Sequence, residues 1–177
     1  YLLAAATMVV KGDILLPKGT FKLSKPVVFS NHVRLKGKGN GVTKLKVSAD
    51  INAITFTGGT NAGIDSYIGN SSLGIEGMTI EGLDANTKPL VSVTFVGRYR
   101  FQDVIFSHNG GGALYLRSTQ DAVILDCHIR YCGNKAANKY AVFMDDYGVD
   151  ATATDQMNVN DIKFMGCTFE HNTGGLI

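Results

Sequence analysis

The densest acidic segment of the sequence has the clearest capacity for chemistry. It contains Asp145, Asp146 and Asp150, with Asp155 a few residues further on. Two carboxyl groups about 5–5.5 Å apart support retaining glycoside hydrolysis, and a separation of about 6.5–9.5 Å supports inversion. A β-eliminating lyase instead needs a base, and often a cation such as Ca²⁺ held by carboxylates. Asp145 with any of the other three could meet either need. The simpler alternative is a solvated acidic loop, or a loop that grips an incidental calcium ion.

Aromatic and charged residues precede this segment on a predicted sheet. Strands with alternating apolar residues are expected at 54–57, 93–96, 114–117 and 142–145. With the apolar residues inward, two outward columns follow. They are Thr55, Thr94, Tyr115 and Phe143, and then Thr57, Val96, Arg117 and Asp145. Rings pack on the apolar C–H surface of a sugar while charged groups bond its hydroxyls. An exposed ring ladder that only stabilises neighbouring strands is the alternative.

These two features define the candidate site. The candidate catalytic residues are Asp145, Asp146 and Arg117, and the candidate substrate-binding residues are Tyr115, Phe143, Thr94 and Asp150. No metal-binding residues and no cofactor are predicted, apart from the Ca²⁺ ion that the acidic loop could hold.

A repeat runs through the chain and must position these residues. Segments 75–80, 101–106, 124–129 and 164–169 align with one another, and residues 35–37 form a degenerate earlier copy. In each segment an apolar residue is followed two positions later by Gly or Asp, and then by two alternating apolar residues. The spacing between the four copies ranges from 23 to 40 residues. A period of this length is typical of stacked repeats.

The extra residue in each copy predicts a corner between two short strands. It is Gly77, Asp103, Asp126 or Gly166, and these residue types tolerate the left-handed conformation that turns a chain. A further strand precedes each copy, so each unit has three strands. Units of this kind stack into a solenoid with an inward apolar set. A β-sandwich, the alternative, would show antiparallel hairpins at intervals of about 8–12 residues.

Composition limits the class of protein. The 177 residues are about the size of one domain, and the hydrophobic share of 45% with 18% charged residues argues against disorder. Lys and Arg number 17 and Asp and Glu 15, so the net charge of +2 gives no reason to expect nucleic acid or an anionic membrane as a partner. No apolar run approaches the roughly 18 residues of a membrane-spanning helix. Three cysteines cannot form a disulfide framework.

The N-terminal part carries a resemblance to a known family. Residues 1–10 have the pattern of the end of an amphipathic helix, and residues 13–23 (DILLPKGTFKL) and 33–39 (VRLKGKG) follow. This order resembles the start of the right-handed parallel β-helix in the pectate-lyase-like superfamily, which includes bacteriophage tailspikes and polysaccharide-degrading enzymes. The resemblance covers nearly the whole chain. It implies an all-β solenoid with three strands per coil over 13–177 and a short capping helix over 1–12.

The same resemblance implies where a ligand lies and which sequence motifs a related enzyme would carry. In this superfamily a glycan commonly lies along the outer face of one sheet, flanked by long turns. Here insertions at about 57–72 and 145–160 follow the candidate sheet. Residues 172–177 repeat 109–114, so the chain is expected to stop as a new coil begins. Of the polygalacturonase-like motifs only Asp145-Asp146 matches, and Gly-His-Gly and Arg-Ile-Lys are missing.

Other residues are interpreted as structural first. His108 and His171 fall at equivalent turns, with general-base chemistry as the alternative. Cys127 and Cys167 share an inward position, where buried thiols or a disulfide fit, and Cys132 replaces the Asn of its turn. Residues 37–41 lack the ending of a phosphate-binding loop and are expected to form a turn.

Three functions remain open. The first is a phage tailspike or tail-appendage segment, on the virion tail or otherwise extracellular, that recognises cell-surface polysaccharide, with or without cleaving it. The resemblance implies a homotrimer, since tailspikes usually assemble in this way. The second is a secreted bacterial polysaccharide lyase or glycoside hydrolase. The third is a structural spacer without a ligand.

Overall fold

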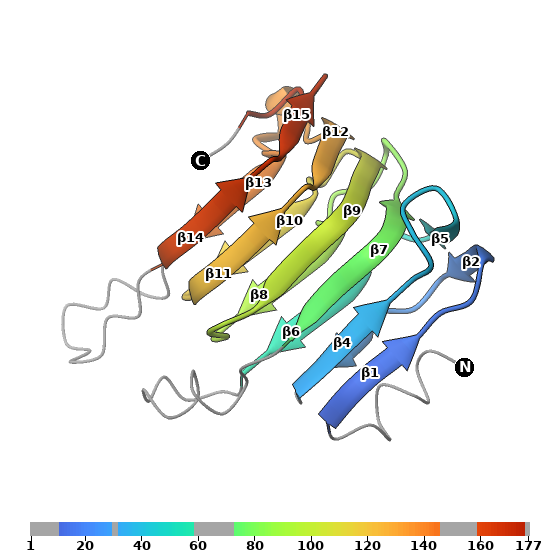
Figure 1. The fold of residues 1–177 in the computed structure, drawn as a ribbon. Coiled ribbons are helices and arrows are strands. Elements are labelled where there is room, and N and C mark those ends of the chain that lie inside the picture. Colours follow the sequence, from blue (N-terminus) through green and yellow to red (C-terminus); the bar gives the residue numbers. More distant parts are fainter. Residues whose placement is uncertain (1–10, 30–31, 59–72, 146–158, 176–177) are drawn as a thin grey trace.

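The described part of the chain is built around a stack of short parallel strands. The computed structural model describes residues 11–29, 32–58, 73–145 and 159–175. Within these ranges the regular elements are strands β1 to β15 and one 3₁₀ helix, η1 (Lys135–Ala137). Figure 1 shows the strands side by side, advancing along the stack in chain order. The prediction of an all-β fold with parallel sheets is confirmed.

The strands form three faces. The first contains β1 (Lys11–Leu15), β4 (His32–Lys36), the first halves of β7 (Gly74–Glu81) and β9 (Arg100–Asn109), β11 (Gln120–Leu125) and β14 (Asn160–Met165). The second contains β2 (Gly19–Leu23), β5 (Thr43–Val47), the second halves of β7 and β9, β12 (His128–Cys132) and β15 (Thr168–Glu170). The third is a five-stranded sheet of β3 (Val27–Phe29), β6 (Ile54–Thr57), β8 (Val91–Thr94), β10 (Leu114–Arg117) and β13 (Val142–Asp145).

Each strand pairs in parallel with its equivalent one coil further on. For example, β1 pairs with β4, β2 with β5 and β3 with β6. The first two faces are joined in one ten-stranded sheet because β7 and β9 continue through the corner between them. The arrangement has three strand segments per coil, as expected for a parallel β-helix. The right-handed sense of the coil stays a prediction.

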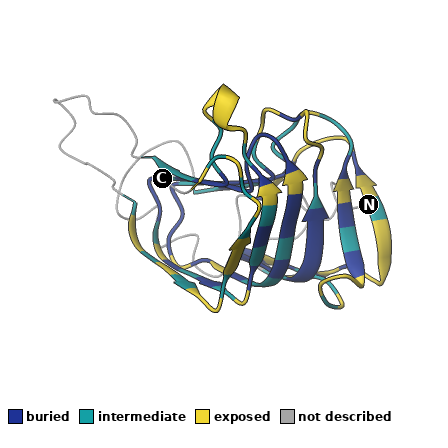
Figure 2. Cartoon of the chain, turned by 90° about the horizontal axis from the view of Figure 1, so that it is seen from above, coloured by how far each residue is buried: buried dark blue, intermediate teal, exposed yellow. Residues whose placement is uncertain are grey.

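The register confirms the aligned positions of the repeat. Leu35 pairs with Ile75, Ile75 with Phe101, Phe101 with Ile124 and Ile124 with Phe164. Residues 35, 75, 101 and 124 are at most 1% exposed, so this column lies in the core. Phe101 is at its centre, with ring centroids 6.0 Å from Phe56 and 5.4 Å from Tyr99. Figure 2 shows buried residues along the strands.

The corner between the first two faces adopts the predicted left-handed backbone. Gly77, Asp103, Asp126 and Gly166 have φ values of 62°, 52°, 51° and 62°. Glycine and aspartate are among the residues that enter this region most easily, which explains why one of them occupies the extra position in each copy. The positive φ breaks the alternation of inward and outward side chains. Apolar residues three apart, such as Phe101 and Val104, can therefore both be buried.

The N-terminal boundary differs from the prediction. Lys11 and Gly12, expected to end a capping helix, begin strand β1 and pair with His32 and Val33 of β4. Parallel pairing with the next coil takes precedence over a helical pattern at these two positions. The rest of the predicted cap lies outside the described residues. No helix among the described residues is long and apolar enough to cross a membrane.

The core column yields the first prediction. Phe101→Ala should lower the free energy of unfolding by about 3–5 kcal/mol, because it removes a fully buried ring and leaves a cavity. Leu15→Ala, at a side chain that is 65% exposed, should change it by no more than about 0.5 kcal/mol. Denaturant unfolding followed by circular dichroism measures both. Equal effects of the two substitutions would contradict the central place of Phe101.

Candidate functional site

A groove runs along the outer side of the five-stranded sheet. It has a volume of ≈ 710 Å³, which lies within the size range of small-molecule sites. Strands β8, β10 and β13 supply its floor through Ser92, Tyr115 and Phe143. The loops 86–89 and 138–140 supply its sides. The complete lining is Asn52, Thr87, Lys88, Pro89, Ser92, Gly111, Leu114, Tyr115, Asn138, Lys139, Tyr140 and Phe143.

Three aromatic rings stack along this groove. Tyr115 and Phe143 are register partners on β10 and β13, with ring centroids 5.7 Å apart and an interplanar angle of 15°. Tyr140 continues the stack at 5.6 Å and 13° from Phe143. Both predicted binding aromatics therefore lie together on the groove floor. Tyr140 was missed because it precedes β13 in a loop, where strand alternation places no side chain.

The ring stack ends at a small residue. Ser92, and not Thr94, pairs with Tyr115. Among the described residues no other ring stacks on Tyr115, so one face of its phenol ring is not covered by a neighbouring aromatic. A ring face of this kind is the surface on which the C–H groups of a sugar pack.

The predicted strand 93–96 was misplaced by two residues. The observed strand is Val91–Thr94, and Thr94 pairs with Arg117 and with Thr57. The physical reason is the left-handed conformation of Phe95, at φ 55°, which ends the strand. Thr94 therefore belongs to the second outward column, with Arg117 and Asp145, and Val96 is fully buried.

A charged cluster lies beside the ring stack. The Tyr115 hydroxyl donates a hydrogen bond to Asp145 Oδ2 at 2.9 Å, and Arg117 Nε lies 3.8 Å from the same oxygen. Partial burial of Tyr115 raises the pKa of its phenol, the bond to Asp145 raises it further, and Arg117 acts in the opposite direction. Asp145 therefore holds Tyr115 in place as a neutral hydrogen-bond donor. Arg117 and Asp145 border the groove and are not part of its lining.

Two lysines bring positive charge to the groove. Lys88 and Lys139 line it, and no carboxylate of the described residues does so. Lys88 sits in a loop that the Asp50 carboxylate holds, accepting bonds from the Thr87 amide, the Thr87 hydroxyl and the Lys88 amide at 2.7, 2.7 and 3.0 Å. These bonds, with that of the hydroxyl foremost, lower the pKa of Asp50. Both lysines lie outside the strands, where the repeat carried no signal for them.

The two predicted long loops beside the sheet and part of the acidic segment fall outside the described residues. The predicted insertions at about 57–72 and 145–160 lie almost entirely outside the described residues, as do Asp146, Asp150 and Asp155. The described residues contain no group of three or more His, Cys, Asp or Glu side chains that could hold a metal ion. The Ca²⁺ site of the acidic loop therefore stays a prediction.

The cysteines and the turn at residues 37–41 serve the fold. Cys127, Cys132 and Cys167 are free thiols, so the disulfide alternative is wrong. Burial raises the pKa of both Cys127 and Cys132 to about 12, which leaves these thiols unreactive. Residues 37–41 form the turn between β4 and β5, as expected.

Comparisons with known proteins support the fold class. No family model matches the sequence, and no curated protein matches it. The structure is similar to ORF18 of Geobacillus virus E2, with a TM-score of 0.75 and 24% identity over 93% of this chain and 32% of that one. It is also similar to PfbA, a surface adhesin of Streptococcus pneumoniae, with a TM-score of 0.66 and 12% identity over 94% of this chain and 44% of that one. This chain thus spans less than half the length of either structure. Both are β-helix-type folds, and the pectate-lyase-like superfamily itself stays a prediction.

The Tyr115–Asp145 bond yields a prediction about titration. Asp145→Asn should lower the pKa of Tyr115 toward about 10, because a neutral amide no longer disfavours the phenolate. The raised pKa of Tyr115 in the folded state also makes the free energy of unfolding depend on pH. The stabilisation that this residue contributes is fully present below the unfolded pKa of about 10, and it is lost as the pH rises through the folded pKa.

An alkaline ultraviolet titration measures this pKa. The Tyr115→Phe variant supplies the baseline, so that the signal of Tyr115 is separated from the other six of the seven tyrosines. An unchanged pKa in Asp145→Asn would show that Asp145 does not control the phenol.

Proposed function

We propose that this chain binds a cell-surface polysaccharide in the aromatic groove, as part of a phage tailspike or tail-appendage protein. The observation that carries the proposal is the stack of Tyr140, Phe143 and Tyr115 along a groove that is also lined by polar side chains. Rings supply apolar contact for sugar C–H groups, and Asn, Thr, Ser and Lys side chains supply partners for hydroxyls. An extended rigid sheet suits a ligand that itself repeats.

The biological setting follows from the resemblance and from the neighbours. A phage protein and a bacterial surface adhesin are among the structures of similar fold, which agrees with a virion or extracellular location. Because the identities are below 25%, the likeness itself concerns the fold. A homotrimer is part of the proposal, since tailspikes of the superfamily commonly assemble in this way.

The two lysines favour an acidic polymer over a neutral one. Lys88 and Lys139 line the groove that the rings occupy, and no carboxylate of the described residues lines it. Their attraction for carboxylate or sulfate groups falls with ionic strength, since the Debye length is about 10 Å at 0.1 M salt.

Affinity electrophoresis tests the binding proposal. Gels that contain polygalacturonate, alginate, hyaluronan or purified bacterial capsular polysaccharide are compared with gels that contain neutral dextran. The native chain should be retarded by at least one acidic polymer, and added salt should weaken the retardation. Tyr115→Ala or Phe143→Ala should weaken binding about tenfold or more, because each removes an aromatic ring on which the sugar would pack.

Matched control variants separate the loss of a ring or lysine in the groove from the loss of one elsewhere on the surface. Phe169→Ala removes a 37% exposed ring from the second face, and Lys163→Ala removes an exposed lysine from the first. Neither should alter retardation, whereas Lys88→Ala and Lys139→Ala should reduce it. The same retardation in all variants, or none with any polymer, would overturn the proposal.

Cleavage by a lyase or hydrolase is the second candidate function. The observation in its favour is that Asp145, bonded to the Tyr115 hydroxyl and 3.8 Å from Arg117, borders the groove. Asp146 is the proposed second carboxyl group. A hydrolase would release reducing ends, and a lyase would release unsaturated products that absorb in the ultraviolet.

Product assays on the same polymers test this second function. Asp145→Asn and Asp146→Asn should each reduce the release of products by at least about 100-fold, which is the usual contribution of a catalytic acid or base. Cleavage that continues unchanged in both variants would exclude this pair of residues. Binding without any product would leave the protein as a passive receptor-binding segment.

A further inference from the structure

A second column of rings lies on the opposite side of the loop that carries η1. His108, Tyr131 and His171 stack with centroid distances of 4.8 Å and 5.0 Å and interplanar angles of 25° and 7°. Tyr131 is 43% exposed, and the His171 side chain is 62% exposed. A hollow of ≈ 560 Å³ runs beside the column, and Asp84, Asn134, Lys135 and Thr173 also line it.

The backbone fixes these rings at one height per coil. His108, Tyr131 and His171 have φ values of 52°, 53° and 52°, so each occupies the same left-handed corner. The residue that follows each of them is tied to the stack. Asn109 Nδ2 donates to the Lys88 and Gly112 carbonyls at 2.8 and 2.7 Å. Asn172 Oδ1 accepts from the Cys132 amide at 2.9 Å.

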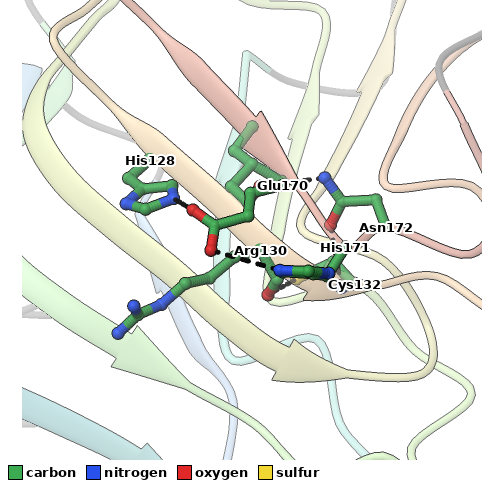
Figure 3. Close-up of polar contacts among 7 residues, drawn as sticks. His128, Arg130, Cys132, Glu170, His171 and Asn172 are labelled. Atoms are coloured by element: carbon green, nitrogen blue, oxygen red, sulfur yellow. Dashed lines mark hydrogen bonds and ion pairs between the residues drawn. The ribbon is translucent and has the colours of Figure 1, made fainter.

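A carboxylate also holds the last ring of the column. Glu170 Oε2 lies 2.7 Å from His128 Nε2, and Glu170 Oε1 lies 3.5 Å from His171 Nε2. Figure 3 shows the Glu170 carboxylate between the two imidazoles, with Asn172 beside Cys132. The polar atoms of this column are therefore already held in position before a ligand binds, which lowers the entropic cost of binding.

The hollow and the aromatic groove are connected around the η1 loop. A third hollow of ≈ 410 Å³ is lined by Lys135, Asn138, Tyr140, Thr173, Gly174 and Gly175. It shares Asn138 and Tyr140 with the groove, and it shares Lys135 and Thr173 with the hollow beside the ring column. Figure 2 shows η1 as an exposed turn that projects from the body of the stack.

We propose that a glycan bound in the aromatic groove continues around the η1 loop into the hollow beside His108, Tyr131 and His171. This inference rests on the proposed function and extends it, because the protein would bind an oligosaccharide of several sugars at two connected sites. The rings carry imidazole nitrogens and a phenol hydroxyl, and Asp84, Lys135 and Thr173 line the same hollow. Together these side chains supply both donors and acceptors, which sugar hydroxyls require.

The second site makes affinity depend on the length of the sugar chain. Two linked contacts on one ligand convert the second binding event into an intramolecular one, so longer oligosaccharides should bind at least about tenfold more tightly than short ones. A ring column that only stabilises neighbouring coils would give no such gain.

Calorimetry on size-fractionated oligosaccharides of polygalacturonate, alginate and hyaluronan tests the inference. In the native chain, fragments long enough to span the loop should bind about tenfold more tightly than di- and trisaccharides. Tyr131→Ala and Lys135→Ala should abolish this gain and leave the affinity for the short fragments unchanged. Lys163→Ala is the control for loss of an exposed lysine. If Tyr131→Ala proves unstable in a thermal melt, Tyr131→Phe and Lys135→Ala provide the same comparison without loss of a ring.

The outcomes separate the two proposals. Tyr115→Ala should weaken the binding of short and long fragments alike. If short fragments do not bind, or bind equally well without Tyr115, the proposed function is wrong and the extension is wrong with it. If short fragments bind through Tyr115 but length brings no gain, or the gain survives in both Tyr131→Ala and Lys135→Ala, the second site alone is overturned.

Discussion

Parallel hydrogen bonding between equivalent strands of successive coils is the constraint on which the rest of this structure depends. It stacks residues 35, 75, 101, 124 and 164 into one column and fixes every outward side chain at a defined height. The pairing of Tyr115 with Phe143 and the column of His108, Tyr131 and His171 both follow from this register. Because a single slip by one residue would move each side chain to the other face, the groove can exist only where the register is maintained.

The sequence predicts the first two faces better than the third. At the first corner an apolar residue is followed after two positions by Gly or Asp, and this pattern marks both register and left-handed turn. The third face, the five-stranded sheet, has no such marker. Val91, Val93 and Phe95 are all apolar at intervals of two, so the strands 91–94 and 93–96 satisfy the same alternation. The backbone at Phe95 decides between them, and no residue type in the sequence signals it.

The candidate site shows the same division. Tyr115, Phe143, Arg117 and Asp145 lie on strands, so alternation predicted that they would face outward, and the register brings them together. Tyr140, Lys88 and Lys139 come from loops whose course depends on long-range contacts. The loop of Lys88, for instance, is held by Asp50, 38 residues earlier in the chain. No periodic pattern can place residues of this kind. The sequence therefore predicts the part of the groove that lies on strands and not the part that the loops supply.

The loop between β12 and β13 lies outside the packed core of the stack. Its 3₁₀ turn carries no buried residue, and the strands on either side of it are held by parallel pairing, β12 with β9 and β15 and β13 with β10. Substitution of residues 135–137 should therefore cost the scaffold little, whereas Asn134 caps the turn and Asn138 ends it in the left-handed conformation. Residues 134–138 line parts of the groove and of both hollows, so substitutions there can change the shape of these surfaces while the stacked strands stay the same.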